Sequence, residues 1–335
     1  MNQNPQIKLN LAVWTTQKDQ HLVTEIQNQL ADQIQICAIG NPSASSLPQL
    51  AQSLNLKATD DLRTLILDSH AQILFLTHTQ GLTLQHLQLA AQQNLIIATT
   101  QPLAQQINDL PPAQLPVIFL PTFLESQGWQ SALSPMQALD KPKLIHISHL
   151  STSNQSSLFA NLYDAWQILA QIAPPPQAIC ASLTGPLSHT PENLYAITGH
   201  IALHANLPNS QTFTINASDA AGSPLRSLRV IANNADLLVD QNNYQIYDKT
   251  NQIIEASEHP NTTHTYTQLL IQAIRHATAR ILNHQKSQNQ TTPTQTIANI
   301  NTSQQSTILA CCQATLLSAR TNQPESPEMF LQMFH

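Results

Sequence analysis

The chain has 335 residues and a formal net charge of −6; 41% of its residues are apolar and 10% are charged. This length allows two domains with sizeable cores, and the apolar fraction is that of a globular protein. Because Lys and Arg are not clustered and the net charge is negative, the sequence excludes a nucleic-acid-binding surface, which needs a basic face.

The sequence predicts neither membrane insertion nor export. No apolar run approaches the roughly 20 residues that span a bilayer, and residues 1–6 have neither a basic nor an apolar segment. The cysteines lack the spacing of a zinc site and suit thiols in a reducing compartment; they are Cys37, Cys180, Cys311 and Cys312. We therefore expect a cytoplasmic protein with no membrane partner.

Short apolar runs alternate with helical patterns between residues 7 and 120. Strands are predicted over 7–13, 34–39, 71–77, 95–99 and 117–120, and helices after 14–19, over 46–54, 60–66 and 82–93, and from about 102. Such alternation predicts a Rossmann-like, doubly wound parallel sheet that is covered by helices on both faces.

The pattern changes in the second half, after a Pro-punctuated crossover that ends near residue 143. A helix is predicted over 155–172, and two more over 263–282 and 306–320. Strands with short turns between them are predicted over 178–183, 194–205, 212–217, 227–232, 236–239, 244–247 and 253–256. This spacing predicts an open, mostly antiparallel sheet with helices on one face, that is, an α+β domain after the α/β domain.

We therefore expect two domains, 1–122 and 123–335, with the last helix packing back toward the first domain. No metal site is expected. His146 and His149 lie on a predicted strand, where odd spacing places them on opposite faces. His200 and His204 share a face, but four strand residues separate them by about 13 Å.

The turn after the first strand is where a dinucleotide-binding chain carries its G-x-G-x-x-G phosphate motif. In this chain the three glycine positions fall on Trp14, Thr16 and Asp19. A β-carbon at Trp14 closes backbone conformations with positive φ, and we expect the indole to fill space that a pyrophosphate needs. Thr15, Thr16 and Gln17 still offer donors at the start of a helix.

Several ordered segments resemble the Gfo/Idh/MocA family of glucose–fructose oxidoreductase and inositol dehydrogenase. They are the Leu-Ala-Gln-Ser-Leu run at 50–54 with Asp60 and Leu62, the strand 72–77, the helix 86–94, Thr-Gln-Pro-Leu-Ala at 100–104 in place of Glu-Lys-Pro-Leu-Ala, and the segment 316–327. Together these segments extend over most of the chain.

The resemblance implies a two-domain fold and NAD- or NADP-dependent hydride transfer on a sugar-derived or other small polar hydroxyl or carbonyl substrate. It also implies a homo-oligomer that forms through the C-terminal sheet. Cofactor contacts would then come from Trp14, Thr15, Thr16, Gln17, Asn41, Thr77, His78 and Thr100. The catalytic positions would be Gln101, Tyr163 and Asp164.

The departures from the family matter equally. Gln101 stands where the family has its catalytic lysine, and Gly40-Asn41 stands where it has the acid that binds the ribose. The histidine that pairs with an aspartate on the second-domain helix is not apparent. The alternative to a divergent oxidoreductase is therefore a non-catalytic pseudoenzyme that binds a ligand or supports an assembly.

Structural roles for these residues stay open. Gln101 also suits an ordinary polar residue at a helix N-terminus, and His78 suits a loop residue with no role. Asp164 lies on a helix whose other residues read as core, and Ser218-Asp219 suits a turn. The sequence leaves unsettled whether the chain is an enzyme.

Overall fold

The structure is a computed structural model that describes residues 8–43, 47–56, 58–152, 155–186, 189–207, 211–257, 265–287 and 302–333. The chain forms two compact units. The first consists of Met1–Leu103, Asp109–Pro121 and His264–Thr302, and the second of Ala104–Asn108, Thr122–Thr263 and Ser303–His335. The first unit thus includes the segment 264–302, which the sequence assigned to the region 123–335.

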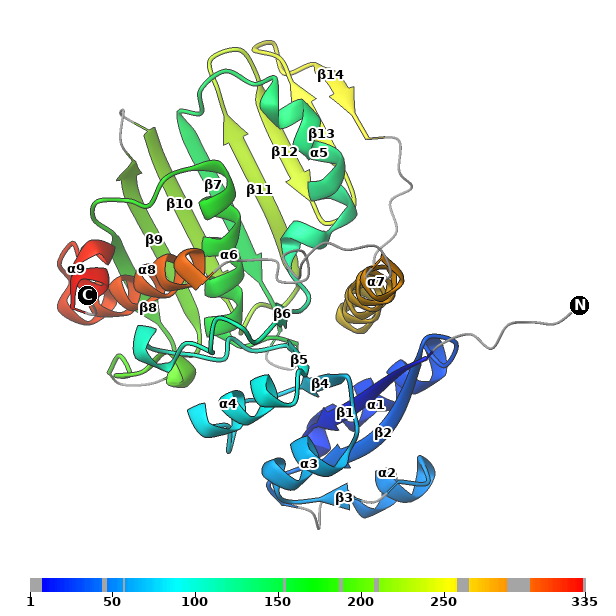
Figure 1. Ribbon diagram of the computed structural model, residues 1–335. Coiled ribbons are helices and arrows are strands. Elements are labelled where there is room, and N and C mark those ends of the chain that lie inside the picture. The colour runs from blue at the N-terminus through cyan, green and yellow to red at the C-terminus, as the bar shows by residue number, and fades with distance from the viewer. Residues whose placement is uncertain are drawn as a thin grey trace, which may run out of the picture. The chain divides into compact units, whose positions relative to one another are not determined.

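Sheet A of the first unit has six strands in the order β3-β2-β1-β4-β5-β6 (Figure 1). Each neighbouring pair is parallel. The strands are β1 (Leu9–Trp14), β2 (Ile34–Gly40), β3 (Ala58–Thr59), β4 (Ile73–Leu76), β5 (Ile96–Thr99) and β6 (Val117–Phe119). This order confirms the predicted doubly wound sheet, because the chain builds outward from β1 first on one side and then on the other.

Two helices of the first unit, those that begin at Leu62 and Leu84, have side chains that cap their free N–H groups. The carboxylate of Asp61 accepts hydrogen bonds from the N–H groups of Arg63 and Thr64, and Thr83 forms a capping box with His86. The helices are α1 (Gln20–Gln29), α2 (Pro48–Ser53), α3 (Leu62–Asp68), α4 (Leu84–Gln92) and α7 (Tyr266–Ser287), and a 3₁₀ turn (Gln17–Asp19) precedes α1.

The helix predicted from about residue 102 is wrong. The structure has only a 3₁₀ turn there, Ile107–Asp109. The Thr99 hydroxyl instead fixes a tight turn, since it donates to the carbonyl of Gln101 at 2.7 Å and accepts from the Gln101 N–H at 3.1 Å. Pro111 and Pro112 follow too soon for a longer helix.

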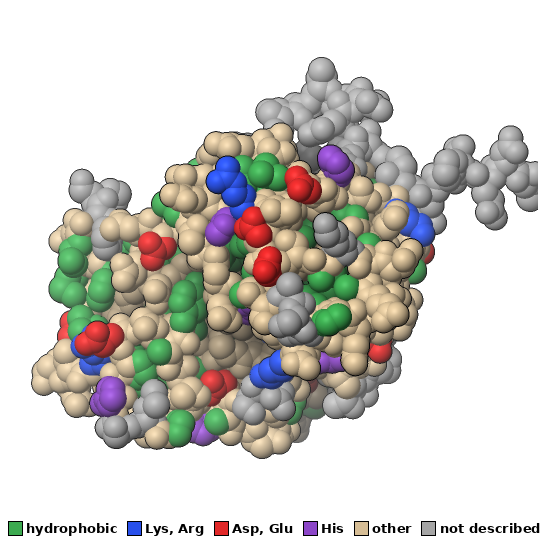
Figure 2. Space-filling view, turned by 90° about the horizontal axis from the view of Figure 1, so that it is seen from below, with side chains coloured by type: hydrophobic (Ala, Val, Ile, Leu, Met, Phe, Trp, Pro, Cys, Tyr) green, Lys and Arg blue, Asp and Glu red, His purple; other side chains and the backbone are tan. Residues whose placement is uncertain are grey.

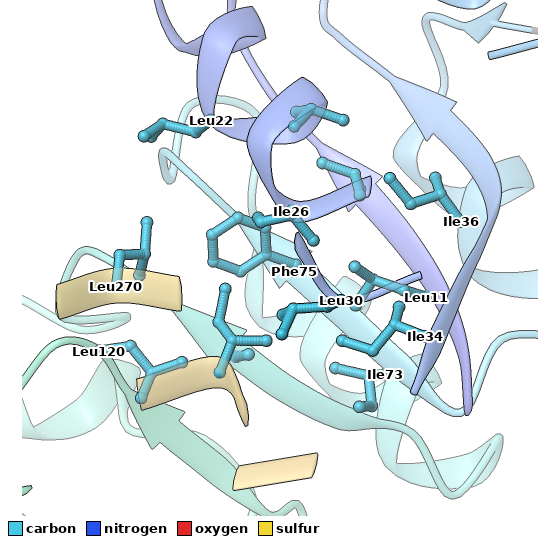
Figure 3. Close-up of a cluster of buried hydrophobic side chains, with 14 of the residues drawn as sticks. Leu11, Leu22, Ile26, Leu30, Ile34, Ile36, Ile73, Phe75, Leu120 and Leu270 are labelled. Carbon is cyan, nitrogen blue, oxygen red and sulfur yellow. The ribbon is translucent and has the colours of Figure 1, made fainter. Parts of the chain in front are cut away.

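Two apolar clusters cover the two faces of sheet A. One joins the sheet to α3 and α4, and the other joins it to α1, α2 and α7. In the second cluster, Ile26 of α1 and Leu270 of α7 lie around Phe75 of β4 (Figure 3). Helix α7 therefore belongs to the core of the first unit, although about 145 residues of the second unit precede it in the chain.

Sheet B of the second unit has eight strands in the order β14-β13-β12-β11-β7-β10-β9-β8. Strands β7 and β10 pair in parallel, and the other pairs that the structure describes are antiparallel. This result confirms the predicted mostly antiparallel sheet. The strands are β7 (Leu144–Leu150), β8 (Cys180–Thr184), β9 (His200–Leu207), β10 (Gln211–Ser218), β11 (Leu225–Ile231), β12 (Asp236–Asp240), β13 (Tyr244–Tyr247) and β14 (Ile253–Ala256).

Helices α5 (Gln127–Gln137) and α6 (Leu158–Ile172) lie against one face of sheet B (Figure 1). Helix α8 (Thr302–Thr321), expected to pack toward the first domain, groups with the second unit, as does α9 (Pro327–Gln332). The Ser318 hydroxyl of α8 accepts a hydrogen bond from the Ala181 N–H of β8. The strand predicted over 194–205 begins only at His200, after a 3₁₀ turn and Gly199 at φ 106°.

The opposite face of sheet B, here called the outer face, carries the alternate side chains of each strand. His204, Thr214, His146, Arg229 and Leu238 lie across it in register. On the view in Figure 2, Lys and Arg side chains are scattered and form no continuous basic patch. Within the described residues, no helix has the length and hydropathy needed to cross a membrane.

Candidate functional site

The carboxyl ends of β1 and β4 lie side by side, because the strand order reverses between them. Ligands of doubly wound sheets bind at such a reversal. Trp14 ends β1 opposite Leu76 of β4 and Gly40 of β2. The residues that follow these strand ends are Thr15, Asn41, Thr77 and His78, so the fold brings most of the expected cofactor residues together.

Trp14 points into the core and not into the turn. Its side chain is 2% exposed and lies in the apolar cluster under α3 and α4. The indole N–H donates to the carbonyl of Gln80 at 3.2 Å. The indole therefore packs inside the fold, between sheet A and the helices α3 and α4.

Three threonine side chains link the ends of β1, β4 and β5. The Thr77 hydroxyl donates to the Thr15 hydroxyl at 3.2 Å, and the Thr100 hydroxyl donates to the Thr77 carbonyl at 3.0 Å. All three residues are buried. Their hydroxyl groups thus hold the strand ends to one another.

Asn41, which was expected to lie where a cofactor ribose would bind, forms its hydrogen bonds within the chain. Its amide N–H donates to the Thr15 carbonyl at 2.6 Å, and its amide oxygen accepts from the Ser43 N–H at 2.7 Å. The residue is buried. Both ends of the amide are therefore used inside the fold.

The turn between β1 and α1 carries both signs of charge. Lys18 and Asp19 are adjacent in the 3₁₀ turn, and the Asp19 carboxylate accepts from the Thr16 hydroxyl at 2.9 Å. Gln17 is exposed. Because Asp19 is the residue that precedes α1, its negative charge lies where the helix N-terminus would otherwise attract an anion.

His78 stacks on the Trp14 ring, with 6.2 Å between ring centroids and 29° between the planes. Its Nδ1 accepts from the Gln80 N–H at 3.2 Å. Burial lowers the pKa of His78, and the Asp19 carboxylate opposes part of that effect. His78 therefore covers one face of the Trp14 indole. At physiological pH its imidazole is neutral.

These residues do not match the donor set that a dinucleotide needs. A pyrophosphate requires glycine backbone that it can approach and a positive helix end, and a ribose requires a free carboxylate or amide. Here the turn has side chains at all three glycine positions, Asp19 stands at the helix end, and Asn41 is bonded internally. Gln101, partly buried in the turn after β5, brings no positive charge.

The second unit holds a buried polar cluster centred on Asp164 of α6. Both carboxylate oxygens accept from the Phe123 N–H at 3.1 Å. His149 Nδ1 of β7 lies 3.3 Å from the carboxylate, and Arg226 Nη1 of β11 lies 3.9 Å from it. Asp164 is 1% exposed, so this geometry ties α6, β7, β11 and the segment at Phe123 together.

Burial is the main factor that decides which groups of this cluster are protonated. It raises the pKa of Asp164 to about 6, and the Arg226 guanidinium and the Phe123 N–H limit that rise. Burial lowers the pKa of His149 well below its usual value, and Arg226 lowers it further. At neutral pH the cluster therefore contains a carboxylate, a guanidinium and a neutral imidazole.

Tyr163 and Asp164 do not form a pair. The Tyr163 ring packs edge-on against Phe159, with 6.2 Å between centroids, and burial raises the pKa of its hydroxyl. Adjacent residues of a helix point about 100° apart, which explains the separation. Helix α6 contains no histidine.

Sequence reasoning missed the contact between His149 and Asp164. The available signal was a carboxylate inside an otherwise apolar helix, since a buried charge needs a partner. Local pattern offers no means to choose that partner among 14 histidines and 13 Lys and Arg. Among the residues that the structure describes, no group of three His, Cys, Asp or Glu side chains is placed to hold a metal.

Several solved structures share this fold at low sequence identity. UDP-N-acetylglucosamine 3-dehydrogenase GnnA from Acidithiobacillus ferrooxidans is 12% identical, with a TM-score of 0.67 over 94% of this chain and 99% of that chain. Levoglucosan dehydrogenase in complex with NADH and levoglucosan is 10% identical, with a TM-score of 0.72 over 96% and 99%.

The WlbA dehydrogenase from Chromobacterium violaceum, in complex with NADH and UDP-GlcNAcA, is 13% identical, with a TM-score of 0.67 over 97% of this chain and 99% of that chain. No protein-family model and no curated protein sequence matches the chain. These similarities confirm the expected two-domain fold along nearly the whole chain.

Proposed function

We propose that this chain is a cytoplasmic protein that uses the Gfo/Idh/MocA-type fold to bind a small polar ligand without nicotinamide-dependent hydride transfer. One observation carries the proposal. The polar side chains at the carboxyl edge of sheet A bond to one another, as Asn41 does to Thr15 and Thr100 to Thr77. An edge whose donors are satisfied internally has few groups left for a dinucleotide.

The proposal also follows from the chemistry that hydride transfer requires. Oxidation of an alcohol needs a group that takes the hydroxyl proton and a charge that stabilises the developing alkoxide. Gln101 has no charge, and losing such electrostatic help costs on the order of 10²–10³ in rate. Asp164 is buried and held by Phe123, Arg226 and His149, so it is occupied inside the fold.

The test is a titration of the purified protein with NADH and with NADPH, followed by nicotinamide fluorescence. We expect no saturable change up to about 1 mM of either nucleotide, a concentration that still detects binding worth about 4 kcal/mol. Levoglucosan dehydrogenase, whose structure holds NADH, is the positive control. Saturable binding at micromolar concentrations would contradict the proposal.

A divergent NAD-dependent oxidoreductase is the second candidate. It is favoured by the NADH complexes of levoglucosan dehydrogenase and WlbA, whose folds match 96% and 97% of this chain. If NADH binds, the next measurement is absorbance at 340 nm with NAD⁺ or NADP⁺ and a panel of sugars and sugar nucleotides. Turnover that the Gln101→Ala variant lowers would establish this function instead.

The proposal includes a homo-oligomer that forms through the outer face of sheet B. Leu225 and Leu238 are exposed on that face, and Ile253 and Ile254 are exposed on the edge strand β14. A second copy of the chain would cover this apolar surface.

A further inference from the structure

Cys180 of β8 and His204 of β9 lie directly opposite each other in sheet B. Because residues in register share a face, Cys180 lies with His204 on the outer face. Directly opposed residues of antiparallel strands have Cβ atoms about 4.5–5.5 Å apart. His204 is exposed, and Cys180 is a partly exposed free thiol. The outer face thus presents a thiol and an imidazole side by side, the two side-chain types that hold Zn²⁺ in structural sites.

The donor atoms of this pair are not engaged elsewhere in the part of the chain that the structure describes. No hydrogen bond or ion pair joins Cys180 or His204 to another described residue by its side chain. Thr214 is the neighbour of His204 on β10, but its hydroxyl lies 2.6 Å from Nδ1 of His146. The thiol and the imidazole therefore remain available to a ligand.

One chain provides only half of a zinc site. Structural Zn²⁺ is bound by four ligands in a tetrahedron, and among the described residues no third His, Cys, Asp or Glu joins this pair. A second copy would supply another Cys180 and another His204, which completes a Cys₂His₂ set. The two thiolates would also neutralise the charge of the ion, so an interface could bury the site without an unpaired charge. Thiolate ligands favour Zn²⁺ over the harder Mg²⁺ and Ca²⁺.

A two-fold dimer through the outer face can bring these half-sites together. One residue from each of the neighbouring strands lies in register in a row across that face: Cys180, His204, Thr214, His146, Arg229 and Leu238. A two-fold axis that runs along this row places each residue against its own counterpart. Leu238 then meets the Leu238 of the second copy in the apolar contact of the proposed self-association. The same axis brings the two pairs of Cys180 and His204 together.

The spacing between packed sheets suits such a site. Sheets that pack face to face lie about 10 Å apart, so an ion midway between them lies about 5 Å from each backbone. A Cys side chain and a Zn–S bond of about 2.3 Å together span that distance, and the longer His side chain reaches it with a Zn–N bond of about 2.0–2.1 Å. Ligands on both copies can therefore reach one ion.

We propose that Cys180 and His204 of two copies together bind one Zn²⁺ between the outer faces of their B sheets. The inference rests on the self-association that is part of the proposed function, and it adds a metal ion to that interface. Zinc would link the copies at the β8–β9 end of the face, while the exposed leucines meet further along it. Because the four ligands come together only between two copies, bound metal and dimer mass should rise together.

The experiment uses the full chain, freed of metal with EDTA and kept reduced with a phosphine, to which ZnCl₂ or CoCl₂ is added. We expect Zn²⁺ to strengthen dimerisation by at least about tenfold in a dilution series followed by light scattering, with saturation at one ion per two chains. Co²⁺ should give thiolate-to-metal charge-transfer absorption and the d–d bands of a tetrahedral ion. Saturation at one ion per chain, or the absence of the charge-transfer band, would overturn the proposal.

The Cys180→Ser and His204→Ala variants each remove one type of ligand at a solvent-accessible position. Loss of a residue that only supports a metal ligand costs about 10–100-fold in affinity, so loss of a ligand itself should cost about 100-fold or more. The matched control is His200→Ala, because His200 is exposed on the same face of β9 but lies opposite Thr184. Thermal unfolding followed by circular dichroism checks that each variant is folded. Zinc affinity that Cys180→Ser leaves unchanged would contradict the site.

The zinc site and the proposed function fail in different ways. A dimer whose strength does not depend on zinc contradicts the zinc site alone, and a mass of one chain at every zinc concentration contradicts the site and the self-association together. A covalent dimer that forms only when the phosphine is left out would be a disulfide between two copies of Cys180, which also overturns the zinc site. Binding of NADH together with zinc-dependent dimerisation contradicts the proposed function and supports the zinc site.

Discussion

At the residue scale, Trp14 and Gly40 form one packing unit. A Cβ built on Gly40 would lie 2.7 Å from Cε3 and Cζ3 of the Trp14 indole, closer than atoms in contact allow. The indole therefore requires bare backbone at the neighbouring strand end. The chain therefore has a tryptophan where the first phosphate-binding glycine was expected, and a glycine at the neighbouring end of β2 makes room for the indole.

The Gly40→Ala variant tests this packing unit. We expect it to lower the free energy of unfolding by about 1–3 kcal/mol, the usual cost of overpacking a core. In a Trp14→Leu background the same change should cost less, because the indole edge is gone while the contact with the Thr59 carbonyl at 3.0 Å remains. Urea unfolding of the wild type, the two single variants and the double variant, followed by circular dichroism, gives the coupling energy between the two positions. An equal cost of Gly40→Ala in both backgrounds would contradict the packing of Gly40 against the indole.

Asp164 predicts a dependence of stability on pH. Its pKa is raised from 3.8 to about 6 by burial, with Glu125 adding to the rise and Arg226 opposing it. A raised folded-state pKa means that stability is fully present below the unfolded pKa and is lost as pH rises through the folded one. The loss falls between about pH 4 and pH 7 and amounts to up to about 3 kcal/mol.

The Asp164→Asn variant removes this titration. We expect the difference in unfolding free energy, wild type minus variant, to fall as the pH rises from about 4 to 7. His149 works in the opposite direction, since its lowered pKa makes the fold less stable as the pH drops below 6.5. Repeating the pair in a His149→Gln background separates the two groups. A difference that is constant with pH in that background would refute the assignment.

At the scale of elements, α7 shows how a helix far along the chain completes an earlier core. Leu270, Ile274 and Ala277 of α7 are buried in the cluster that also contains Phe75 and Ile26 (Figure 3). Without α7, that face of sheet A would expose a large apolar surface to water. The first unit therefore depends on a segment that is made after most of the second unit.

The Ile274→Ala variant tests this dependence. Loss of the side chain from a packed core should cost about 2–5 kcal/mol, and the loss should be felt in the first unit. We expect hydrogen exchange to accelerate in peptides from β1 and β4. Gln272→Ala, exposed on the same helix, is the matched control. Faster exchange confined to sheet B would contradict the grouping of α7 with the first unit.

At the scale of the whole molecule, sheet B separates two kinds of surface. One face is covered by α5 and α6, and the outer face mixes polar pairs with exposed leucines. Arg229 bonds Asp236 at 2.7 Å, and His146 bonds Thr214 at 2.6 Å on that face. Polar pairs surrounding apolar residues are common in interfaces between subunits.

The Leu238→Glu variant tests the proposed self-association. Leu238 is 36% exposed and lies opposite Arg229 on the neighbouring strand, so the new carboxylate finds a cation in the monomer and disrupts an apolar contact between copies. Light scattering should show a mass that falls from a multiple of 36.9 kDa to 36.9 kDa. Leu67→Glu, at a similarly exposed leucine of α3, is the control. A wild-type mass of one chain would refute self-association.

The sequence by itself determined the two sheets, their strand types and most helix positions. Periodicity and capping residues such as Asp61 and Thr83 act within a few positions of one another, so they can be read along the chain. The residues grouped at the carboxyl edge of sheet A were also predictable, because parallel strands that alternate with helices end at one edge.

The tertiary structure alone decided which way Trp14 points, that Asn41 bonds Thr15, and that His149 and Arg226 meet Asp164. It also decided that α7 completes the first unit. Each of these outcomes depends on packing between segments that are distant in sequence, where volume and hydrogen-bond satisfaction select one partner among many. The pattern of residues along the chain therefore does not identify these partners.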